Sequence, residues 1–560
     1  MASKQIIYDE EVRKALKRGV DAVANAVCVT IGPRGRNVAI DKGYGSPTIT
    51  NDGVSIAKEI TLKDKFENMG AEIAKEVASK TNDTAGDGTT TAVVLTQAIV
   101  TEGMRRTALG ANAMNVRHGI DEAVKDAVEE LKKMAKQVKG NDEIRQVATI
   151  SAESEELGKV IAETIEKVGK DGVVTVEESQ SFGIESEVVE GLEFDKGYVS
   201  PYMITNPERM EAEYKDVPVL VTDKKISTVK EILPLLERLA QTGKKDLVII
   251  ADDCDGEALA TFVVNKLRGA FNVLVVKAPG YGDRKKDQLA DIAVTVGAEV
   301  ISEELGRSLD KVDITHLGKA ARIVSTKDST IIIGGQGTKA DMDARVASLK
   351  KQLVAADSKF DREKLEERIA KLAGGVAVIR VGAATETEMK YLKLKIEDAV
   401  NATKAAIEEG IVPGGGAALA KVAKILEKKM QGKSEAVEKA EIKTGYAILL
   451  KALNSPLYQI AYNAGREDNA AVVVHDVSSG DSNTGFDAKT DKVVNMLEAG
   501  IVDPVKVTRS SVQNAASAAA ILLTTEAAVA EEPEEKPAAP APDMGGMGGM
   551  GGMGGMGGMY

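Results

Sequence analysis

The stretch Gly86-Asp87-Gly88-Thr89-Thr90-Thr91-Ala92 places one carboxylate and three consecutive hydroxyl groups between glycines and an apolar run. Glycines let the backbone approach a ligand closely, and a helix start offers N–H groups and a dipole that favour an anion. Asp87 would then hold the Mg²⁺ that neutralises phosphate oxygens, because Mg²⁺ usually takes one or two protein carboxylates. The alternative is an ordinary capped helix. Because Asn82 and Asp83 precede the run, the whole pattern favours a phosphate site.

The composition sets the size and class of the protein. With 560 residues the chain predicts three or four domains, at ~150 residues per domain. The hydrophobic content of 43% supports large cores, and the aromatic content of 3%, without Trp, makes them aliphatic. A net charge of −13 argues against a nucleic-acid partner, which would normally require a basic surface.

Cysteine usage and the termini indicate the compartment. Cys28 and Cys254 are the only cysteines, which fits a reducing environment without a disulfide scaffold. The three histidines show no metal-ligand spacing, the N-terminus lacks a targeting segment, and no run approaches 18 apolar residues. We therefore expect a cytoplasmic protein with no membrane partner.

Helical periodicity dominates the first part of the chain. Apolar residues recur every three or four positions over 12–27, and Gly and Pro end this helix within 31–36. Short strands are predicted at 37–40 and 48–50, and mainly helix is predicted over 53–136.

The middle of the chain is typical of an α/β domain. Apolar runs at 247–250, 273–276 and 330–333 predict buried strands with helices between them. Gly191 and the pair Gly374-Gly375 flank this part, either as hinges or as plain turn glycines. If they are hinges, the middle domain is inserted into another domain and the flanking segments fold together.

A long helix is expected in the second half of the chain. Thr385 and Glu388 have capping-box spacing, and an apolar face follows over 389–407. At ~100° per residue, Asp398 lies about 180° from the centre of that face, so it points away from the core of its own helix. Such an acid is usually solvated, but Gly414-Gly415-Gly416, a second loop able to approach phosphate, follows within a few turns.

The C-terminal segment has low complexity. Residues 531–543 are rich in Pro, Ala and Glu, and 545–559 consist of five Gly-Gly-Met repeats. Because Gly-rich chain cannot repay the entropy of ordering, residues after about 529 are predicted to be disordered.

A set of specific segments is collinear with one known family from about residue 2 to 528. These segments are Thr30-Ile31-Gly32-Pro33-Arg34-Gly35-Arg36-Asn37, Asp52-Gly53, Gly86 to Thr91, Ile396-Glu397-Asp398-Ala399, Gly414-Gly415-Gly416 and Asp503-Pro504. Together with the Gly-Gly-Met tail, they make the chain resemble the bacterial GroEL-type (group I) chaperonins.

The resemblance implies a multidomain fold with a mainly α-helical equatorial domain, a small α/β intermediate domain and an α/β apical domain. The implied bounds are 1–133 with 409–528 for the equatorial ATPase domain, 134–190 with 376–408 for the intermediate hinge domain, 191–375 for the apical substrate-binding domain, and 529–560 for a disordered tail.

The implied function is that of an ATP-dependent chaperone. Such subunits form heptameric rings, usually stacked in pairs, that capture unfolded polypeptides and enclose them under a co-chaperonin of the GroES type. ATP and Mg²⁺ are the implied cofactors, with K⁺ as an optional further cation.

The resemblance also implies roles for individual residues. Asp87 should hold Mg²⁺, and Asp398 and Asp52 should position and activate the attacking water. Because Asp398 belongs to the intermediate domain, hydrolysis should require that domain to close. The other implied nucleotide-binding residues are Thr30, Ile31, Gly32, Pro33, Asn51, Gly88, Thr89, Thr90, Thr91, Gly415, Asp487, Ala488, Lys489 and Asp503.

Two positions depart from the family pattern. Asn51 stands where GroEL has a lysine, so a cationic phosphate contact is lost. Asp487 stands where GroEL has an asparagine, which adds charge near the base. These departures affect the expected nucleotide affinity and rate but remove none of the catalytic acids.

A second feature of the sequence concerns substrate capture. In segment 256–268, apolar residues spread over more than one helix face, which predicts an exposed binding surface unless the helix is deeply buried. A second helix near Pro234 and the loop 198–203 would extend this surface. The predicted substrate-binding residues are Tyr198, Tyr202, Met203, Leu233, Leu236, Leu259, Val263 and Val264.

Two other functions compete with that of a chaperone. A small-molecule kinase needs a second polar pocket and a general base beside the γ-phosphate, and the sequence shows no such constellation. A non-catalytic ring or scaffold would not need Asp52, Asp87 and Asp398.

Overall fold

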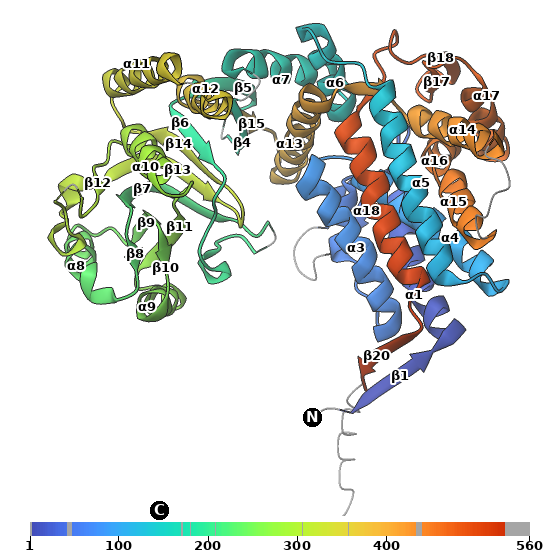
Figure 1. Cartoon of the computed structure of the whole chain (residues 1–560), viewed down its shortest axis with the longest axis horizontal. Coiled ribbons are helices and arrows are strands. Elements are labelled where there is room, and N and C mark those ends of the chain that lie inside the picture. Colours follow the sequence, from blue (N-terminus) through green and yellow to red (C-terminus); the bar gives the residue numbers. More distant parts are fainter. Residues whose placement is uncertain are drawn as a thin grey trace, which may run out of the picture.

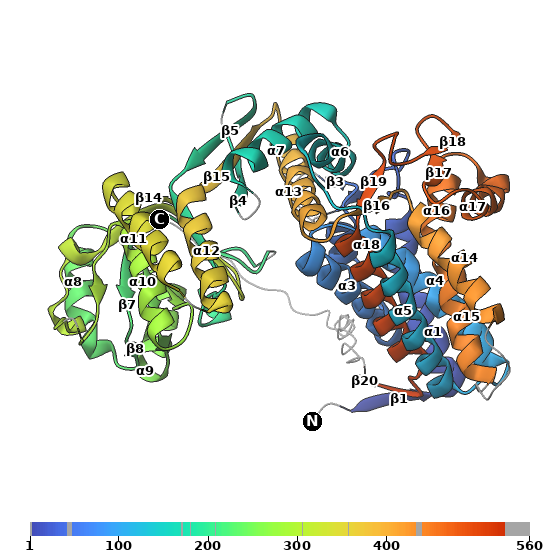
Figure 2. The ribbon, with the colours of Figure 1, turned by 45° about the horizontal axis from the view of Figure 1, so that its top comes forward.

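Three regions with separate buried cores make up the computed structural model (Figure 1). We call them the helical region (residues 3–136 and 410–532), the linking region (137–190 and 376–409) and the sheet region (191–375). Both views place the linking region between the other two (Figure 2). The structure describes residues 3–41, 47–169, 172–179, 181–207, 209–304, 306–356, 358–432 and 440–532.

The helical region packs long helices closely. In α1 (Asp9–Cys28) the predicted apolar face is buried, and it lies against α3 (Lys65–Ala85). A Cβ on Gly19 would lie 1.8 Å from the carbonyl oxygen of Glu67, so this crossing requires glycine. The other helices are α2 (Gly53–Glu59), α4 (Thr89–Ala108), α5 (Ala113–Met134), α14 (Ala417–Gly432), α15 (Ala440–Ala452), α16 (Ser455–Asn463), α17 (Ala470–Ser479) and α18 (Val505–Leu523).

Short antiparallel strand pairs complete the helical region. The predicted strands near 37–40 and 48–50 are confirmed as β2 (Val38–Ile40) and β3 (Thr48–Thr50). The other pairs are β16 (Ile411–Pro413) with β19 (Val502–Pro504), and β17 (Thr484–Asp487) with β18 (Lys492–Asn495).

The two ends of the described chain pair with each other. In β1 (Lys4–Tyr8) and β20 (Ala527–Glu531) the register runs from Lys4 opposite Glu531 to Tyr8 opposite Ala527. Ile7, Ala528 and Ala530 bury their side chains in the core of the helical region. The prediction of disorder from about residue 529 is therefore wrong for 529–531. Its remainder, 533–560, lies outside the described residues.

The linking region folds from two distant segments. Its sheet has the order β4-β15-β5, with β4 (Val173–Glu178) parallel and β5 (Gly183–Val189) antiparallel to β15 (Val376–Gly382). Val376 lies opposite Val189, so the chain enters and leaves the sheet region at adjacent points. The flanking segments therefore fold together around an inserted middle part. The helices are α6 (Asn141–Ala152), α7 (Glu155–Val168) and α13 (Glu386–Glu409).

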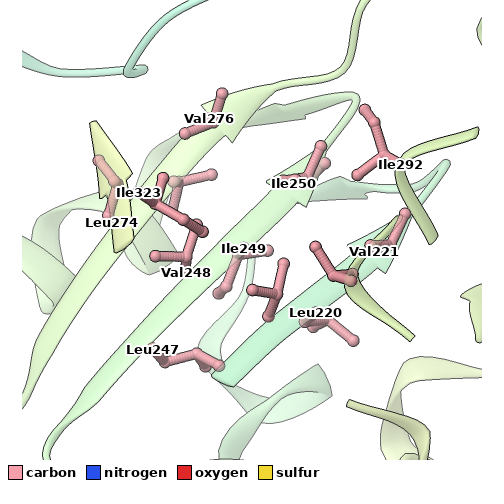
Figure 3. Close-up of a cluster of buried hydrophobic side chains, with 14 of the residues drawn as sticks. Leu220, Val221, Leu247, Val248, Ile249, Ile250, Leu274, Val276, Ile292 and Ile323 are labelled. Atoms are coloured by element: carbon pink, nitrogen blue, oxygen red, sulfur yellow. The ribbon is translucent and has the colours of Figure 1, made fainter. Parts of the chain in front are cut away.

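The sheet region centres on seven strands in the order β11-β9-β7-β13-β14-β6, with β12 paired to β7. The three apolar runs are confirmed as strands, and the β9 side chains Leu247, Val248, Ile249 and Ile250 lie among those of its neighbours (Figure 3). The strands are β6 (Gly191–Phe194), β7 (Ala212–Thr222), β9 (Asp246–Ala251), β11 (Asn272–Lys277), β12 (Val300–Ile301), β13 (Gly318–Ser325) and β14 (Thr330–Gly335), with a separate pair β8 (Lys225–Ile226) and β10 (Asp253–Cys254). The helices are α8 (Leu233–Gln241), α9 (Gly256–Leu267), α10 (Asp283–Val296), α11 (Lys339–Ala355) and α12 (Lys359–Gly374).

The predicted fold class is confirmed, with one mainly helical part and two α/β parts. Among the described residues, none of the helices is both long enough and apolar enough to cross a membrane.

Candidate functional site

Three carboxylates from separate parts of the chain lie close together. Asp52 immediately precedes α2, Asp87 lies between α3 and α4, and Asp398 is on α13 of the linking region. Burial raises the pKa of Asp398 well above its usual value, and the negative charges of Asp52 and Asp87 raise it further. We call these three residues the acid cluster. The acid cluster thus lies where the N-terminal half of the helical region, which supplies Asp52 and Asp87, meets the linking region, which supplies Asp398.

Hydrogen bonds orient two of these acids. The N–H groups of Val54 and Ser55 donate to the Asp52 carboxylate at 3.2 and 3.0 Å, so this acid caps α2. Gly88 N–H donates to Asp87 Oδ1 at 2.5 Å, and the Ser151 hydroxyl donates to Oδ2 at 3.0 Å. Burial nevertheless raises the pKa of Asp87, so these hydrogen bonds do not fully offset its loss of hydration.

Threonine hydroxyls and glycine backbone form the wall beside the acid cluster. The hydroxyl oxygens of Thr30 and Thr90 are 3.5 Å apart. A Cβ on Gly53 would lie 2.5 Å from the Thr90 hydroxyl oxygen and 2.9 Å from that of Thr89, so a larger residue would displace both. Gly88 has φ +79°, and Thr89 begins α4 directly after it, while the half-buried Thr91 follows in the first turn. The start of a long helix thus faces the cluster, where it favours an anion.

A second wall comes from the C-terminal half of the chain. Register pairs Val412 of β16 with Asp503 of β19, which places Asp503 beside the glycine loop that follows β16. Burial raises the pKa of Asp503 to about 7, and the charge of Asp87 adds to this, while N–H groups of Gly415 and Gly416 oppose it. The influence of Asp87 places this wall next to the acid cluster.

The loop from Thr30 to Pro33 connects the two walls. Ile31 packs with Ala488, Phe486 and Met496 in one small core, whereas Pro33 is exposed. Gly32 has φ +87°, and a Cβ there would lie 3.1 Å from the Ile460 side chain. Phe486, Met496 and Ile460 were not predicted, because local sequence does not show which apolar residues meet a distant loop.

The two positions that depart from the family pattern have local partners. The Asp487 carboxylate accepts hydrogen bonds from Lys489 N–H at 2.9 Å and from the Thr490 hydroxyl at 2.5 Å, so it caps its own hairpin turn. The exposed Lys489 offers its carbonyl oxygen to Arg34 at 3.2 Å. Asn51 donates to Glu153 of the linking region at 3.5 Å.

The donor set fits a nucleotide with a divalent cation. Three acids that are costly to ionise together gain from a cation, and hydroxyl groups and helix N–H groups beside them can donate to phosphate oxygens. No group of three His, Cys, Asp or Glu side chains among the described residues is arranged to hold a metal alone. Mg²⁺ usually binds through one or two carboxylates plus phosphate oxygens and water.

Residues of other regions reach the acid cluster and were missed from the sequence. Ser151 on α6 binds Asp87, and a Cβ on Gly86 would lie 2.1 Å from the Cβ of Asn401 on α13. Arg209 of the sheet region donates to both carboxylate oxygens of Glu397, at 3.3 and 2.9 Å, and its charge lowers the pKa of the neighbouring Asp398. Nothing near these residues in the sequence signals such contacts.

The sheet region exposes an apolar surface on α9 and beside it. Phe262 and Ala258 face the core, whereas Val264 is 43% exposed and Leu267 is 75% exposed. The predicted Leu259, Val263 and Leu236 are half-buried, and Tyr202 and Leu233 are exposed. We call Tyr202, Leu233, Val264 and Leu267 the apolar surface.

Two predicted members of this surface are buried. Tyr198 and Met203 belong to the core of the sheet region, and the Met203 sulfur accepts a hydrogen bond from Val275 N–H at 3.3 Å. The prediction that they are exposed for substrate contact is wrong. Met203 ends a short 3₁₀ helix, Pro201–Met203, that turns its side chain inward while Tyr202 points outward.

Comparison with known families gives the wider context of this site. The model of the TCP-1/cpn60 chaperonin family matches residues 23–533, which include both walls, the acid cluster and the apolar surface. Members of this family act in protein folding and generally bind ATP with Mg²⁺. The match covers most of the 560 residues, and the chain therefore belongs to the TCP-1/cpn60 chaperonin family.

Proposed function

We propose that this chaperonin is of the GroEL type and hydrolyses ATP to drive capture and release of non-native polypeptides. The observation that carries the proposal is the acid cluster, because Asp52, Asp87 and Asp398 converge beside a helix start, yet come from two regions. An acid cluster that serves only structure would be expected to have paired cations instead.

In this proposal the acid cluster divides the work of hydrolysis. Asp87 would hold the divalent cation, which would neutralise negative charge on the phosphate oxygens, so that water can attack the γ-phosphorus and ADP can leave. Asp398 accepts a proton from water, since its raised pKa makes it a better base than an ordinary carboxylate. Asp52, fixed as the cap of α2, orients the same water.

The two walls bind the remaining parts of the nucleotide. Thr30, Thr89, Thr90 and Thr91, with the N–H groups after Gly88, donate to phosphate oxygens. Gly415 and Asp503 take the ribose side. Asp487, Ala488 and Lys489 flank the base, and Ile31, Gly32, Pro33 and Asn51 complete the pocket. K⁺ is an optional further cation at the phosphates.

The region boundaries match functional domains in this proposal. The helical region is the equatorial ATPase domain, the linking region is the intermediate hinge domain and the sheet region is the apical domain. Because Asp398 and Ser151 lie on the linking region, its position relative to α4 controls hydrolysis. Gly191 and Gly375 act as hinges for the sheet region.

The apolar surface captures polypeptide without sequence specificity, at about 25 cal/mol per Å² of apolar area buried. Heptameric rings, stacked in pairs in the cytoplasm, would present seven such surfaces around a cavity that a GroES-type co-chaperonin closes.

ATP turnover with and without an unfolded polypeptide, followed by recovery of native substrate, tests this proposal. We expect Mg²⁺-dependent turnover and ATP-dependent recovery, which the co-chaperonin increases. Turnover without recovery would point to a metabolic ATPase, and recovery without turnover would point to a passive scaffold. Mass measurement of the assembly tests the heptameric rings.

A further inference from the structure

A fully buried lysine lies on the helix that follows the glycine loop. Lys421 of α14 is 4% exposed, and among the described residues it contacts no carboxylate within ion-pair distance. Its ammonium group donates instead to three backbone carbonyl oxygens: Val477 at 2.9 Å, Gly480 at 3.3 Å, and Asp481. All three donors of the ammonium group therefore have partners.

The three carbonyls belong to the end of α17 and the turn after it. The last carbonyls of a helix lack partners within the helix and carry a partial negative charge, which favours a cation there. Burial lowers the pKa of Lys421, while the charge of Asp481 opposes this shift. A buried cation is costly unless fully hydrogen-bonded, so this arrangement holds α14 and the turn at a fixed separation.

This turn leads directly into the second wall of the nucleotide pocket. The carbonyl oxygen of Asp481 also accepts from Thr484 N–H at 3.0 Å, and Thr484 is the first residue of β17. β17 carries Phe486 and ends at Asp487, immediately before Ala488.

The β17–β18 hairpin packs against the glycine loop and the start of α14. A Cβ on Gly415 would lie 3.4 Å from Met496 Cε and 3.9 Å from the Phe486 carbonyl oxygen. A Cβ on Gly485 would lie 3.0 Å from the Cβ of Ala417, one turn before Lys421. The start of α14 thus meets the β17–β18 hairpin, and Lys421, one turn further along the same face of α14, ties this helix to the turn that precedes β17.

We infer that Lys421 is a positioning residue that sets the distance between the glycine loop and the β17–β18 hairpin, and thereby the affinity for the base and ribose of the nucleotide. The inference rests on the proposed function only in assigning this pocket to the nucleoside. Lys421 does not touch the ligand. It acts through the turn 480–484.

The test compares Lys421→Met with Lys424→Met in the full chain. Lys424 lies one turn further along α14 and pairs with Glu427 on the surface at 3.0 Å, so it is a matched control. Calorimetry measures binding of ADP with Mg²⁺ and of inorganic tripolyphosphate with Mg²⁺. We expect Lys421→Met to weaken ADP binding about tenfold, which is the size of effect typical of residues that orient binding groups without touching the ligand. Tripolyphosphate binding should stay unchanged. Lys424→Met should change neither.

Hydrogen exchange of the backbone amides in 482–488, without nucleotide, gives a second readout that does not depend on ATP hydrolysis. We expect faster exchange in Lys421→Met and wild-type exchange in Lys424→Met. Equal losses for ADP and tripolyphosphate, or unchanged exchange in 482–488, would overturn the inference.

Two other outcomes are possible: wild-type protein that binds no ADP, and a Lys421→Met variant that does not fold. If wild-type protein binds no ADP, the proposed function fails, whereas the exchange result still decides whether Lys421 orders the hairpin. If Lys421→Met does not fold, the test uses Lys421→Arg, which keeps the positive charge but replaces the ammonium group with a planar guanidinium group. It should fold and weaken ADP binding more than tripolyphosphate binding, and an equal effect on both would overturn the inference.

Discussion

The acid cluster and the apolar surface depart in opposite directions from the usual distribution of residues. At the acid cluster, Asp52, Asp87 and Asp398 are half-buried beside one another, and burial together with the neighbouring acids raises the pKa values of Asp87 and Asp398. On the sheet region, Val264 and Leu267 remain in water. Both arrangements cost free energy in the unliganded chain, and each is relieved by a ligand of complementary chemistry, a cation in the first case and an apolar polypeptide in the second.

The largest expected effect tests the polar half of this comparison. Asp398→Ala should lower ATP turnover by at least about a hundredfold, because it removes the proposed general base. ATP binding should stay nearly intact, since Asp87 and both walls remain. The melting temperature of the nucleotide-free protein should not fall, because the change relieves repulsion among neighbouring half-buried acids. Steady-state kinetics, calorimetry and thermal denaturation measure the three quantities.

The isosteric variant Asp398→Asn serves as the control for side-chain volume, and it should behave like Asp398→Ala. Near-normal hydrolysis by either variant would remove Asp398 from the mechanism and leave the acid cluster without its proposed role.

Neighbouring residues of α9 test the apolar half. Val264→Ser should weaken capture of an unfolded polypeptide by about tenfold or more and leave stability and basal ATPase unchanged, because Val264 contributes exposed apolar area. Phe262→Ser should instead destabilise the sheet region by about 3–5 kcal/mol, since Phe262 is 2% exposed and packs in its core. Suppression of substrate aggregation measures capture, and denaturant unfolding measures stability. If Val264→Ser unfolds the protein, α9 is a core helix and the capture role is wrong.

Local patterns and resemblance predicted much of both sites. The apolar face of α1 and the strands β9, β11 and β14 follow from periodicity, which depends on neighbouring residues alone. The glycine–threonine run singled out Asp87, and the resemblance added Asp52 and Asp398. Asp398 is not among the buried residues of α13, in line with its predicted position off the apolar face of that helix.

The errors and omissions have a common physical cause. β20 is a short alanine-rich segment whose order depends on β1 at the other end of the chain, so its own sequence predicts little. Tyr198 and Tyr202 occur in one apolar loop, and only the packing of the sheet region decides which is buried. Ser151 and Arg209 reach the acid cluster through contacts between regions, for which a single sequence carries no local signal.

A smaller effect tests whether the sheet region influences the acid cluster electrostatically. Asp398 must be ionised to accept a proton, so turnover should fall as pH falls through its raised pKa. Arg209 lowers that pKa, and Arg209→Met should therefore move the acid limb of the turnover profile to higher pH. Arg209→Lys keeps the charge and should move it less. An unchanged acid limb in Arg209→Met would show that Arg209 only fastens the sheet region to Glu397.

The smallest expected effect concerns the C-terminal end, where two truncations separate the strand from the segment that follows it. Ending the chain after Glu532 should leave the melting temperature and ATPase unchanged, because β20 and its pairing with β1 remain complete. A modest change in refolding yield for some substrates is still expected, since Met-rich chain makes adaptable apolar contacts. Ending the chain after Glu526 removes β20, exposes Ile7 and leaves β1 without a partner, so the melting temperature should fall by roughly a few degrees. Thermal denaturation of both variants decides the matter. Equal melting temperatures would mean that β20 contributes nothing to the helical region, and loss of assembly or ATPase in the longer variant would mean that residues 533–560 are structural.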